Sequence, residues 1–340
     1  MATLGQWVQG ARPRTLPAAI APVLVGTAVA WTQISSIFAL GQSSQFGWFA
    51  YSPLQAEGTL ETGAGPWESF VDLLKRHGSV SIHDLVIRAL FALVVALALQ
   101  VGVNYANDYS DGIRGTDEVR VGPIRLVGQR LAAPAAVKAA AFAAFGIAAA
   151  AGLILVFITQ QPWLIAVGAA AILAAWFYTG GPSPYGYAGL GEIFVFVFFG
   201  LVAVMGSTYI QTLQGSWLAL AGGVATGALS VAILLVNNLR DIPTDRLSGK
   251  RTLAVRIGDP ATRLAFTIAI ATPFAIVLGI AATGRPWALV GLAALPLAIR
   301  PIRTVRGGAS ARDLISALAG TAQLLLAYSV LLSLGLVLSS

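Results

Sequence analysis

The stretch LVIRALFALVVALALQVGVNYANDYSDGIRGTDE, residues 85–118, joins a long apolar run to a cluster of acids. Its apolar part is as long as a helix that crosses the hydrocarbon core of a bilayer, which takes about 20 residues. Asp108, Asp111, Asp117 and Glu118 follow at once, although the whole chain has only 14 acidic residues in 340. The stretch therefore predicts a membrane helix that carries metal chemistry at the membrane surface.

The composition extends this expectation to the whole chain. Hydrophobic residues make up 57% of the chain, charged residues make up 10%, and the mean hydropathy is +0.79. In soluble domains roughly a quarter of the residues are charged. Apolar stretches recur between charged loops, which favours helices over a barrel, whose strands would alternate in polarity. We predict an all-α integral membrane protein, and we expect the first apolar segment to be a retained span because no cleavage site follows it.

We predict nine spans within one transmembrane domain over residues 1–340. The spans are expected near residues 16–34, 84–105, 133–158, 162–179, 189–211, 217–238, 262–282, 286–303 and 312–338. With a cytoplasmic N-terminus, most of the 21 basic residues face the cytoplasm, as the positive-inside rule requires. The exceptions are Lys75, Arg76, Arg88 and Arg285. We therefore predict a multi-pass protein of the cell membrane with cytoplasmic acid-rich loops, whose net charge of +7 needs no nucleic-acid partner.

Residues 35–83 form an insertion between the first two predicted spans. The segment is rich in Gly, Pro, Ser and aromatic residues, and we expect a partly ordered loop with a short interfacial helix on the extracytoplasmic side. We assign it no chemistry. The chain has no cysteine, which excludes disulfides, thiolate nucleophiles and zinc–thiolate sites. His77 and His83 are expected to be ordinary solvated residues, because no further metal-ligand pattern surrounds them.

Two segments share a pattern of Asn, paired Asp, Gly and basic residues. NYANDYSDGIRG ends the second predicted span and LLVNNLRDIPTDRLSGKR ends the sixth. Asp108 and Asp111 are three residues apart, and Asp241 and Asp245 are four apart, so each pair shares one helix face. Paired carboxylates supply the hard oxygen ligands that Mg²⁺ prefers and leave positions for phosphate oxygens. The repeat predicts a pseudo-symmetric bundle with one cavity between two half-sites.

Neutral oxygen donors and cations surround both acid pairs. Asn107 and Asn238 precede the pairs, and Lys250 and Arg251 in GKRT follow the second pair closely. We predict that these two cations bind the phosphate oxygens of a metal-bridged diphosphate. At the mouth of a hydrophobic bundle, the simplest such substrate has a long apolar tail. Further substrate-binding candidates, for which topology and anionic-lipid contact compete as explanations, are Arg14, Arg120, Arg130 and Arg240.

The segment WFYTGGPSPYGYAGLGEI, residues 176–193, is the third marked feature. Its glycines do not follow a strand, which argues against a dinucleotide fingerprint. Tyr178, Tyr185, Tyr187 and Glu192 are candidates to face the cavity, where aromatic rings would stabilise an allylic cation. For each tyrosine, a place in the interfacial aromatic belt is the competing explanation.

NDYSD and RDIPTD, within the two repeated segments, resemble the two Asp-rich motifs of the UbiA superfamily of intramembrane aromatic prenyltransferases. Within it, the three segments and the N-terminal ARPRTLPAAIAPVLVG resemble the 1,4-dihydroxy-2-naphthoate polyprenyltransferase branch of menaquinone synthesis. The resemblance implies nine helices around a central cavity, Mg²⁺ dependence, and transfer of a polyprenyl group from polyprenyl diphosphate to the naphthoate with loss of carbon dioxide. The products would be demethylmenaquinone and diphosphate, and the partners would include membrane lipids.

By matching position, the resemblance also implies a metal-ligand set. Its members are Asn107, Asp108, Asp111, Asp241 and Asp245. The superfamily pattern N-D-x-x-D-x-x-x-D places its last acid at Gly115, whereas the third acid here is Asp117. The naphthoate branch shares this offset, so the departure favours the branch and weakens the metal role of Asp117.

The resemblance leads to a catalytic hypothesis. Mg²⁺, Lys250 and Arg251 would hold the charge that builds on the leaving diphosphate, Tyr178 would shield the cation, and Arg14 would hold the naphthoate carboxylate. The predicted catalytic residues are Asp108, Asp111, Asp117, Asp241, Asp245 and Tyr178. Two alternatives stay open: transfer to another acceptor such as 4-hydroxybenzoate or a porphyrin or chlorophyll ring, and a divalent-cation transporter, since intramembrane carboxylates also mark ion pathways.

Overall fold

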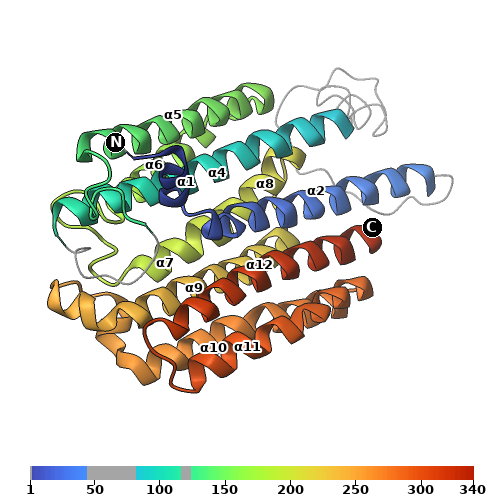
Figure 1. Cartoon of the computed structure of the whole chain (residues 1–340). Coiled ribbons are helices and arrows are strands. Elements are labelled where there is room, and N and C mark those ends of the chain that lie inside the picture. Colours follow the sequence, from blue (N-terminus) through green and yellow to red (C-terminus); the bar gives the residue numbers. More distant parts are fainter. Residues whose placement is uncertain (1, 44–81, 116–123) are drawn as a thin grey trace.

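The structure is a computed structural model that describes residues 2–43, 82–115 and 124–340. Over these ranges the chain forms helices and no strands, which confirms the all-α prediction. The helices that form single rods lie side by side (Figure 1). They are α2 (Pro17–Ser43), α4 (Ile82–Ile113), α5 (Pro134–Thr159), α6 (Leu164–Phe177), α9 (Trp217–Leu247), α10 (Leu253–Ala282) and α12 (Asp313–Leu338).

Two further rods are built from consecutive short helices. The first joins α7 (Gly191–Phe196), the π-helical η2 (Val197–Val202) and α8 (Ala203–Thr212). The second joins the 3-10 helix η3 (Pro286–Ala294) to α11 (Leu295–Arg306). The short α1 (Leu4–Gly10) and η1 (Pro13–Thr15) precede α2.

The two halves of the chain form two sides of the bundle (Figure 1). Successive rods run in opposite directions, and α4 packs along α5 as α9 packs along α10. Helices α4 and α9 therefore finish at the same end of the bundle, which we call the acid end because both carry their aspartates there. This arrangement brings the two repeated segments together, as the sequence pattern predicts.

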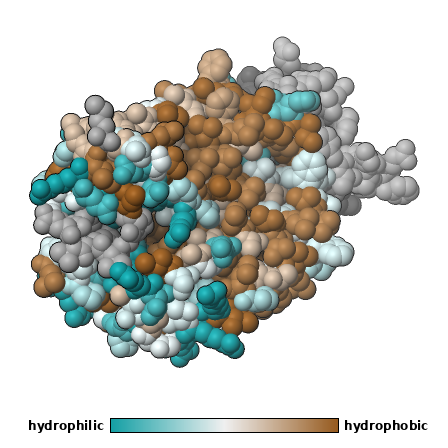
Figure 2. Space-filling view, viewed as in Figure 1, coloured by the Kyte–Doolittle hydropathy of each residue, from teal (hydrophilic) through white to brown (hydrophobic). Residues whose placement is uncertain are grey.

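Eight of the described segments are long and apolar enough to cross a membrane, and they coincide with eight of the predicted spans. The remaining prediction, residues 162–179, contains only α6, an apolar helix of 14 residues. At 1.5 Å per residue it is about 21 Å long, shorter than the roughly 30 Å hydrocarbon core, so the count of nine is not confirmed. Figure 2 shows apolar surface across the middle of the bundle and hydrophilic surface at the acid end.

Several helices extend beyond their predicted edges. Helix α4 continues past residue 105 to Ile113, and α9 continues past residue 238 to Leu247, because the polar residues of these last turns are buried inside the protein. Helix α2 continues past residue 34 to Ser43, so the first part of the predicted insertion, residues 35–43, is helical. The rest of the insertion up to residue 81, with His77, lies outside the described residues.

Small residues let the helices approach closely. An added Cβ at Gly26 of α2 would lie 2.6 Å from Ser207 Cβ on α8, and one at Gly200 would lie 2.5 Å from the carbonyl oxygen of Gly223 on α9. The hydroxyl of Thr208 donates to the carbonyl oxygen of Gly26 over 2.9 Å. In lipid, where burying apolar surface favours no particular helix contact, close packing and interhelical hydrogen bonds hold such a bundle together.

Candidate active site

A cavity of about 1080 Å³ lies between the two sides of the bundle. Residues 92 and 107 of α4 both line it, so it extends about 22 Å along that helix at 1.5 Å per residue. Its wall is apolar over most of this length. Polar side chains gather where the cavity reaches the acid end, and they include Asn104, Asn107, Arg125, Tyr178, Asn237 and Arg240. The shape fits a ligand with a charged head and a long apolar tail.

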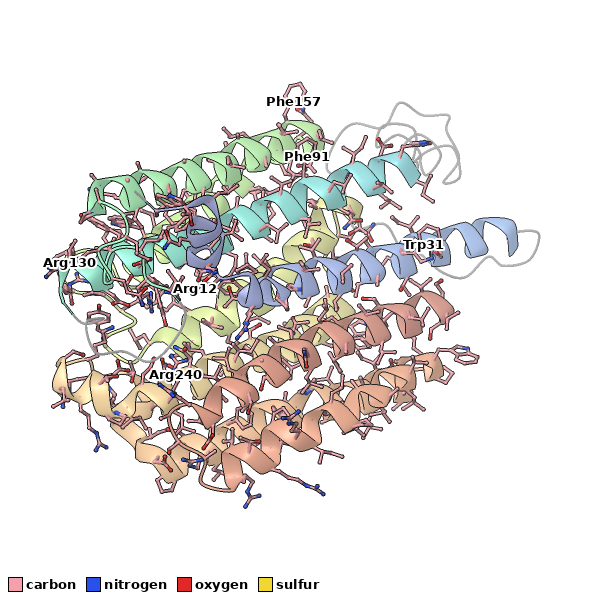
Figure 3. All side chains as sticks on the ribbon, in the orientation of Figure 1. Arg12, Trp31, Phe91, Arg130, Phe157 and Arg240 are labelled. Atoms are coloured by element: carbon pink, nitrogen blue, oxygen red, sulfur yellow. The ribbon has the colours of Figure 1, made fainter. Side chains whose placement is uncertain are left out.

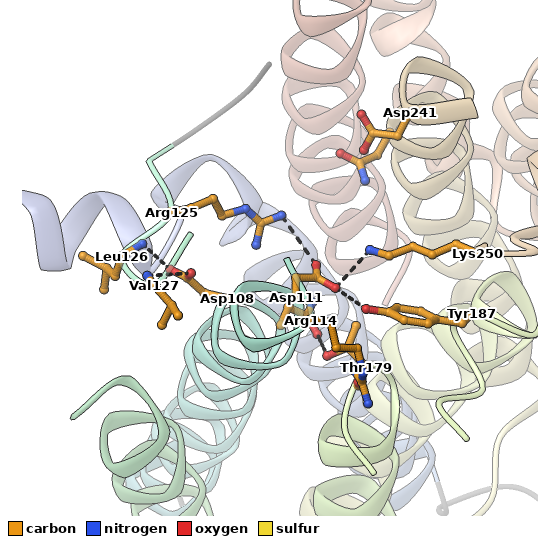
Figure 4. Close-up of polar contacts among 12 residues, drawn as sticks. Asp108, Asp111, Arg114, Arg125, Leu126, Val127, Thr179, Tyr187, Asp241 and Lys250 are labelled. Atoms are coloured by element: carbon orange, nitrogen blue, oxygen red, sulfur yellow. Dashed lines mark hydrogen bonds and ion pairs between the residues drawn. The ribbon is translucent and has the colours of Figure 1, made fainter. Parts of the chain in front are cut away.

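The carboxylate of Asp111 joins the two repeated segments beside this polar end (Figure 4). It accepts a hydrogen bond from Lys250 Nζ at 3.0 Å and another from the Tyr187 hydroxyl. Arg125 Nη2 lies 4.0 Å from its second oxygen. Lys250 Nζ also lies 4.5 Å from the centre of the Tyr187 ring, a cation–π distance. Two buried cations and a phenol thus converge on one carboxylate.

Tyr187 keeps its proton in this cluster. Burial, followed by the neighbouring Asp111 carboxylate, raises the pKa of the Tyr187 hydroxyl above its ordinary value. The hydroxyl is therefore a hydrogen-bond donor at neutral and mildly alkaline pH.

Asp108 makes a different set of contacts, although it shares the buried face of α4. One of its oxygens accepts the backbone N–H of Leu126 at 2.7 Å and the other accepts that of Val127 at 3.2 Å. The side chain is 1% exposed. Asp108 therefore fastens the segment that follows residue 123 to α4, and its predicted role as a metal ligand stays a prediction.

Arg240, labelled in Figure 3, makes side-chain hydrogen bonds within the second repeated segment. Arg240 donates through Nε and Nη2 to the two oxygens of Asp241, at 2.7 and 2.8 Å, and Nη2 also donates to Asn237 Oδ1 at 2.8 Å. Asp245 is buried, with Oδ2 3.5 Å from Thr252 Oγ1. The amide of Asn238 donates to Glu192 Oε1 at 2.9 Å, so the segment also holds the start of α7.

The loop between α6 and α7 closes over the end of α4. Arg114 donates to the backbone carbonyl of Thr179, and the Thr179 hydroxyl donates to Asn107 Oδ1 at 2.8 Å. Tyr178 lines the cavity, with its ring 5.6 Å from that of Tyr185 in an edge-to-face contact. Tyr178 and Tyr185 therefore line the cavity, whereas Tyr187 and Glu192 are not among its described lining residues, and the catalytic role of Tyr178 stays a prediction.

The remaining predicted residues fall into three groups. Arg14 lines the main cavity. Arg130 and Arg251 are exposed outside it, and Figure 3 places Arg130 at the outer edge of the acid end. Asp117 and Arg120 lie outside the described residues.

Sequence reasoning left Arg125, Asn237 and Thr179 out of the predicted site. Asn237 stands inside the second repeated segment, and Arg125 lies ten residues after the first, so closeness in sequence to the paired acids was the available signal. Thr179 contributes through one hydroxyl contact that only the folded loop reveals.

The donor set fits Mg²⁺ that is shared with a phosphorylated substrate. Among the described residues, no three acidic or histidine side chains converge as a metal site. Mg²⁺, however, is usually bound through one or two carboxylates together with substrate phosphates and water, rather than by an all-protein cage. Asp111, Asp241 and Asp245 are buried near the polar end of the cavity and supply carboxylates of this kind.

The model of the UbiA prenyltransferase family matches residues 73–317. The chain belongs to this family. It is therefore a membrane prenyltransferase, and the transporter alternative is set aside. A protein of Mycobacterium tuberculosis named 1,4-dihydroxy-2-naphthoate octaprenyltransferase is 48% identical over 97% of this chain and 96% of its own length. An Escherichia coli protein of the same name is 34% identical over 76% of this chain and 70% of its own.

A solved structure of a UbiA-like fold supports the architecture of this prenyltransferase. Its title describes digeranylgeranylglyceryl phosphate synthase in membranes, and it aligns over 98% of each chain with a TM-score of 0.55 and 10% sequence identity. At this identity the likeness concerns the fold alone. It agrees with the all-helical bundle described above.

Proposed function

We propose that this prenyltransferase transfers a polyprenyl group from polyprenyl diphosphate to 1,4-dihydroxy-2-naphthoate, with loss of carbon dioxide, to give demethylmenaquinol, the reduced form of the predicted demethylmenaquinone, because the transfer removes no electrons from the ring. The observation that carries the proposal is the convergence of Asp111, Lys250, Arg125 and Tyr187 at the polar end of a long apolar cavity. The acceptor comes from the names of the relatives, the first of which is 48% identical over nearly the whole chain.

The donor would lie with its diphosphate at the acid end and its tail along the cavity. Lys250, Arg125 and Arg240 are buried or partly buried cations at that end. Charge-assisted hydrogen bonds from Lys and Arg are strong phosphate contacts, especially where water is excluded. Arg251, which is exposed, would act only from the rim.

The residues that would hold Mg²⁺ are Asn107, Asp111, Asp241 and Asp245. Asp108 would join them through the lone pairs of its carboxylate oxygens that do not accept the N–H groups of Leu126 and Val127. When bound, Mg²⁺ neutralises the diphosphate and makes it a better leaving group. Asn238, Asp117 and Arg120 stay predicted contributors to the same site.

In the transfer step, the allylic C–O bond breaks and its electron pair stays on the diphosphate, whose charge Lys250 and Arg125 stabilise. Tyr178 presents an aromatic ring to the cavity in which the allylic cation forms. The ring carbon that bears the carboxylate attacks the cation, and loss of carbon dioxide returns the C–C electrons to the ring. Arg14, which lines the same cavity, would hold the carboxylate until it leaves.

In the proposed orientation, the single domain of residues 1–340 spans the plasma membrane and its acid end faces the cytoplasm. The support is the concentration of Arg and Lys in the loops at that end. The tail can then enter from the bilayer while the diphosphate and the acceptor meet at the cytoplasmic surface.

The test uses purified protein in detergent with Mg²⁺, labelled polyprenyl diphosphate, and either 1,4-dihydroxy-2-naphthoate or 4-hydroxybenzoate. We expect prenylated product and carbon dioxide from the naphthoate alone, with both abolished by EDTA. Product from the benzoate alone would keep the donor site and replace the acceptor. No product from either acceptor would contradict the proposal.

A further inference from the structure

Helix α6 is a thin wall between the cavity and the outside of the bundle. The structure describes every residue of α6, and none of them is buried. Leu164, Gly168 and Ala175 line the cavity on one side, while Leu173 and Phe177 are exposed on the other. The cavity is therefore bounded here by one short helix, and the size of the inward side chains sets its width.

Three glycines line the cavity away from the acid end. They are Gly152 on α5, Gly168 on α6 and Gly206 on α8. Helix α5 starts at the acid end and Gly152 lies in its last third, whereas α6 starts at the opposite end and Gly168 lies in its second turn. Apart from the neighbouring residues and backbone of its own helix, no described atom lies within 4 Å of a Cβ added at any of the three. Gly152 and Gly206 are partly buried and Gly168 is exposed, and side chains at these positions would occupy open space beside the cavity that the three glycines line.

We propose that Gly152, Gly168 and Gly206 are specificity-determining positions that set the longest prenyl tail the enzyme accepts. The inference rests on the proposed function, which anchors the diphosphate at the acid end. Ligand pockets usually measure about 300–1,000 Å³, so this cavity of about 1080 Å³ is larger than an aromatic acceptor needs. The tail enters the far part of the cavity only when it is long. A side chain at these glycines obstructs long tails and spares short ones.

The test compares Gly152→Leu with Gly146→Leu on the same helix. Gly146 also has open space around its Cβ position, but it is exposed and does not line the cavity. Leucine is a better helix former than glycine, so neither change is expected to weaken α5. The measurement is kcat/KM for geranyl diphosphate and for octaprenyl diphosphate, each with Mg²⁺ and the naphthoate.

We expect Gly152→Leu to lower kcat/KM for the octaprenyl donor by roughly tenfold or more, as overpacking of a filled cavity does, while the geranyl donor reacts as in the wild type. Gly146→Leu should leave both donors unchanged. Gly206→Leu repeats the test from another helix and decides it if Gly152→Leu does not fold.

Two results would overturn the inference: an equal loss with both donors, or wild-type behaviour of the cavity variants with both. Wild-type protein that transfers neither prenyl group would instead overturn the proposed function.

Discussion

At the scale of single residues, Asp111 connects the two acid-rich segments. Its carboxylate is buried, and burying a charge is costly unless the charge is paired and hydrogen-bonded. Lys250 and Tyr187 supply those partners from the second half of the chain. The cations are thereby fixed at the end of the cavity before a diphosphate arrives, which is the preorganisation that favours charge stabilisation in a transition state.

Replacing Asp111 by Asn should abolish most prenyl transfer. The neutral amide can neither pair with Lys250 as the carboxylate does nor bind Mg²⁺ as well, and losses of about 100-fold are usual when one such electrostatic group is removed. Initial rates with saturating Mg²⁺ measure the effect. Asp259→Asn is the matched control, because Asp259 is an exposed partner of Arg263 outside the cavity. Equal rates for the two variants would contradict the role of Asp111.

Replacing Tyr187 by Phe should weaken the reaction less. The variant keeps the ring beneath Lys250 and loses only the hydroxyl that donates to Asp111, a hydrogen bond to a charged group worth about 1.5–3 kcal/mol. We expect kcat/KM to fall by roughly tenfold on that basis. Tyr209→Phe, which removes a hydroxyl bonded to Gln161 at the opposite end, is the control and should react normally. Wild-type kinetics in the Tyr187 variant would show that its hydroxyl is dispensable.

At the scale of elements, the last turns of α4 and α9 carry the acidic residues of the site, and hydropathy alone predicts that both helices end before these turns. The loss of apolar residues after residues 105 and 238 predicts helix ends there, but both helices continue because their polar groups find partners inside the protein. The spacing of the paired acids does predict the outcome, since residues three or four apart share a helix face. Contacts that depend on a neighbouring loop, such as Asp108 with Leu126, have no signal in a local pattern.

The segment after residue 123 should depend on Asp108 for its attachment to α4. Asn in place of Asp108 turns an NH₂ group toward one of two backbone N–H donors, so one buried donor loses its acceptor. Such a loss costs about 1–3 kcal/mol of unfolding free energy. Thermal unfolding in detergent measures it, with Asp259→Asn as the comparison because that carboxylate is exposed and accepts from the side chain of Arg263. If the Asp108 variant unfolded at the same temperature as the wild type, the proposed role of Asp108 in attaching this segment to α4 would be contradicted.

At the scale of the whole molecule, the composition predicts the architecture and the repeat predicts that its two halves meet. An apolar chain in a bilayer has to satisfy its backbone within helices, so the apolar segments locate the rods with little ambiguity. The rod from Leu164 to Phe177 is the exception, because a helix beside a cavity does not need the length of a full span. The pairing of Asp111 with Lys250, 139 residues apart, follows from the arrangement of all the rods and could not be derived from one segment.

The orientation of the molecule in the membrane can be tested with introduced cysteines, since the chain has none of its own. Ser310 lies in the exposed loop between α11 and α12 at the acid end, and Thr283 lies in the exposed turn after α10 at the opposite end. The basic loops should keep the acid end in the cytoplasm. In intact cells a membrane-impermeant maleimide should therefore label Thr283→Cys and leave Ser310→Cys unlabelled until the cells are opened. Labelling of Ser310→Cys alone in intact cells would reverse the orientation and place the proposed diphosphate site on the outside.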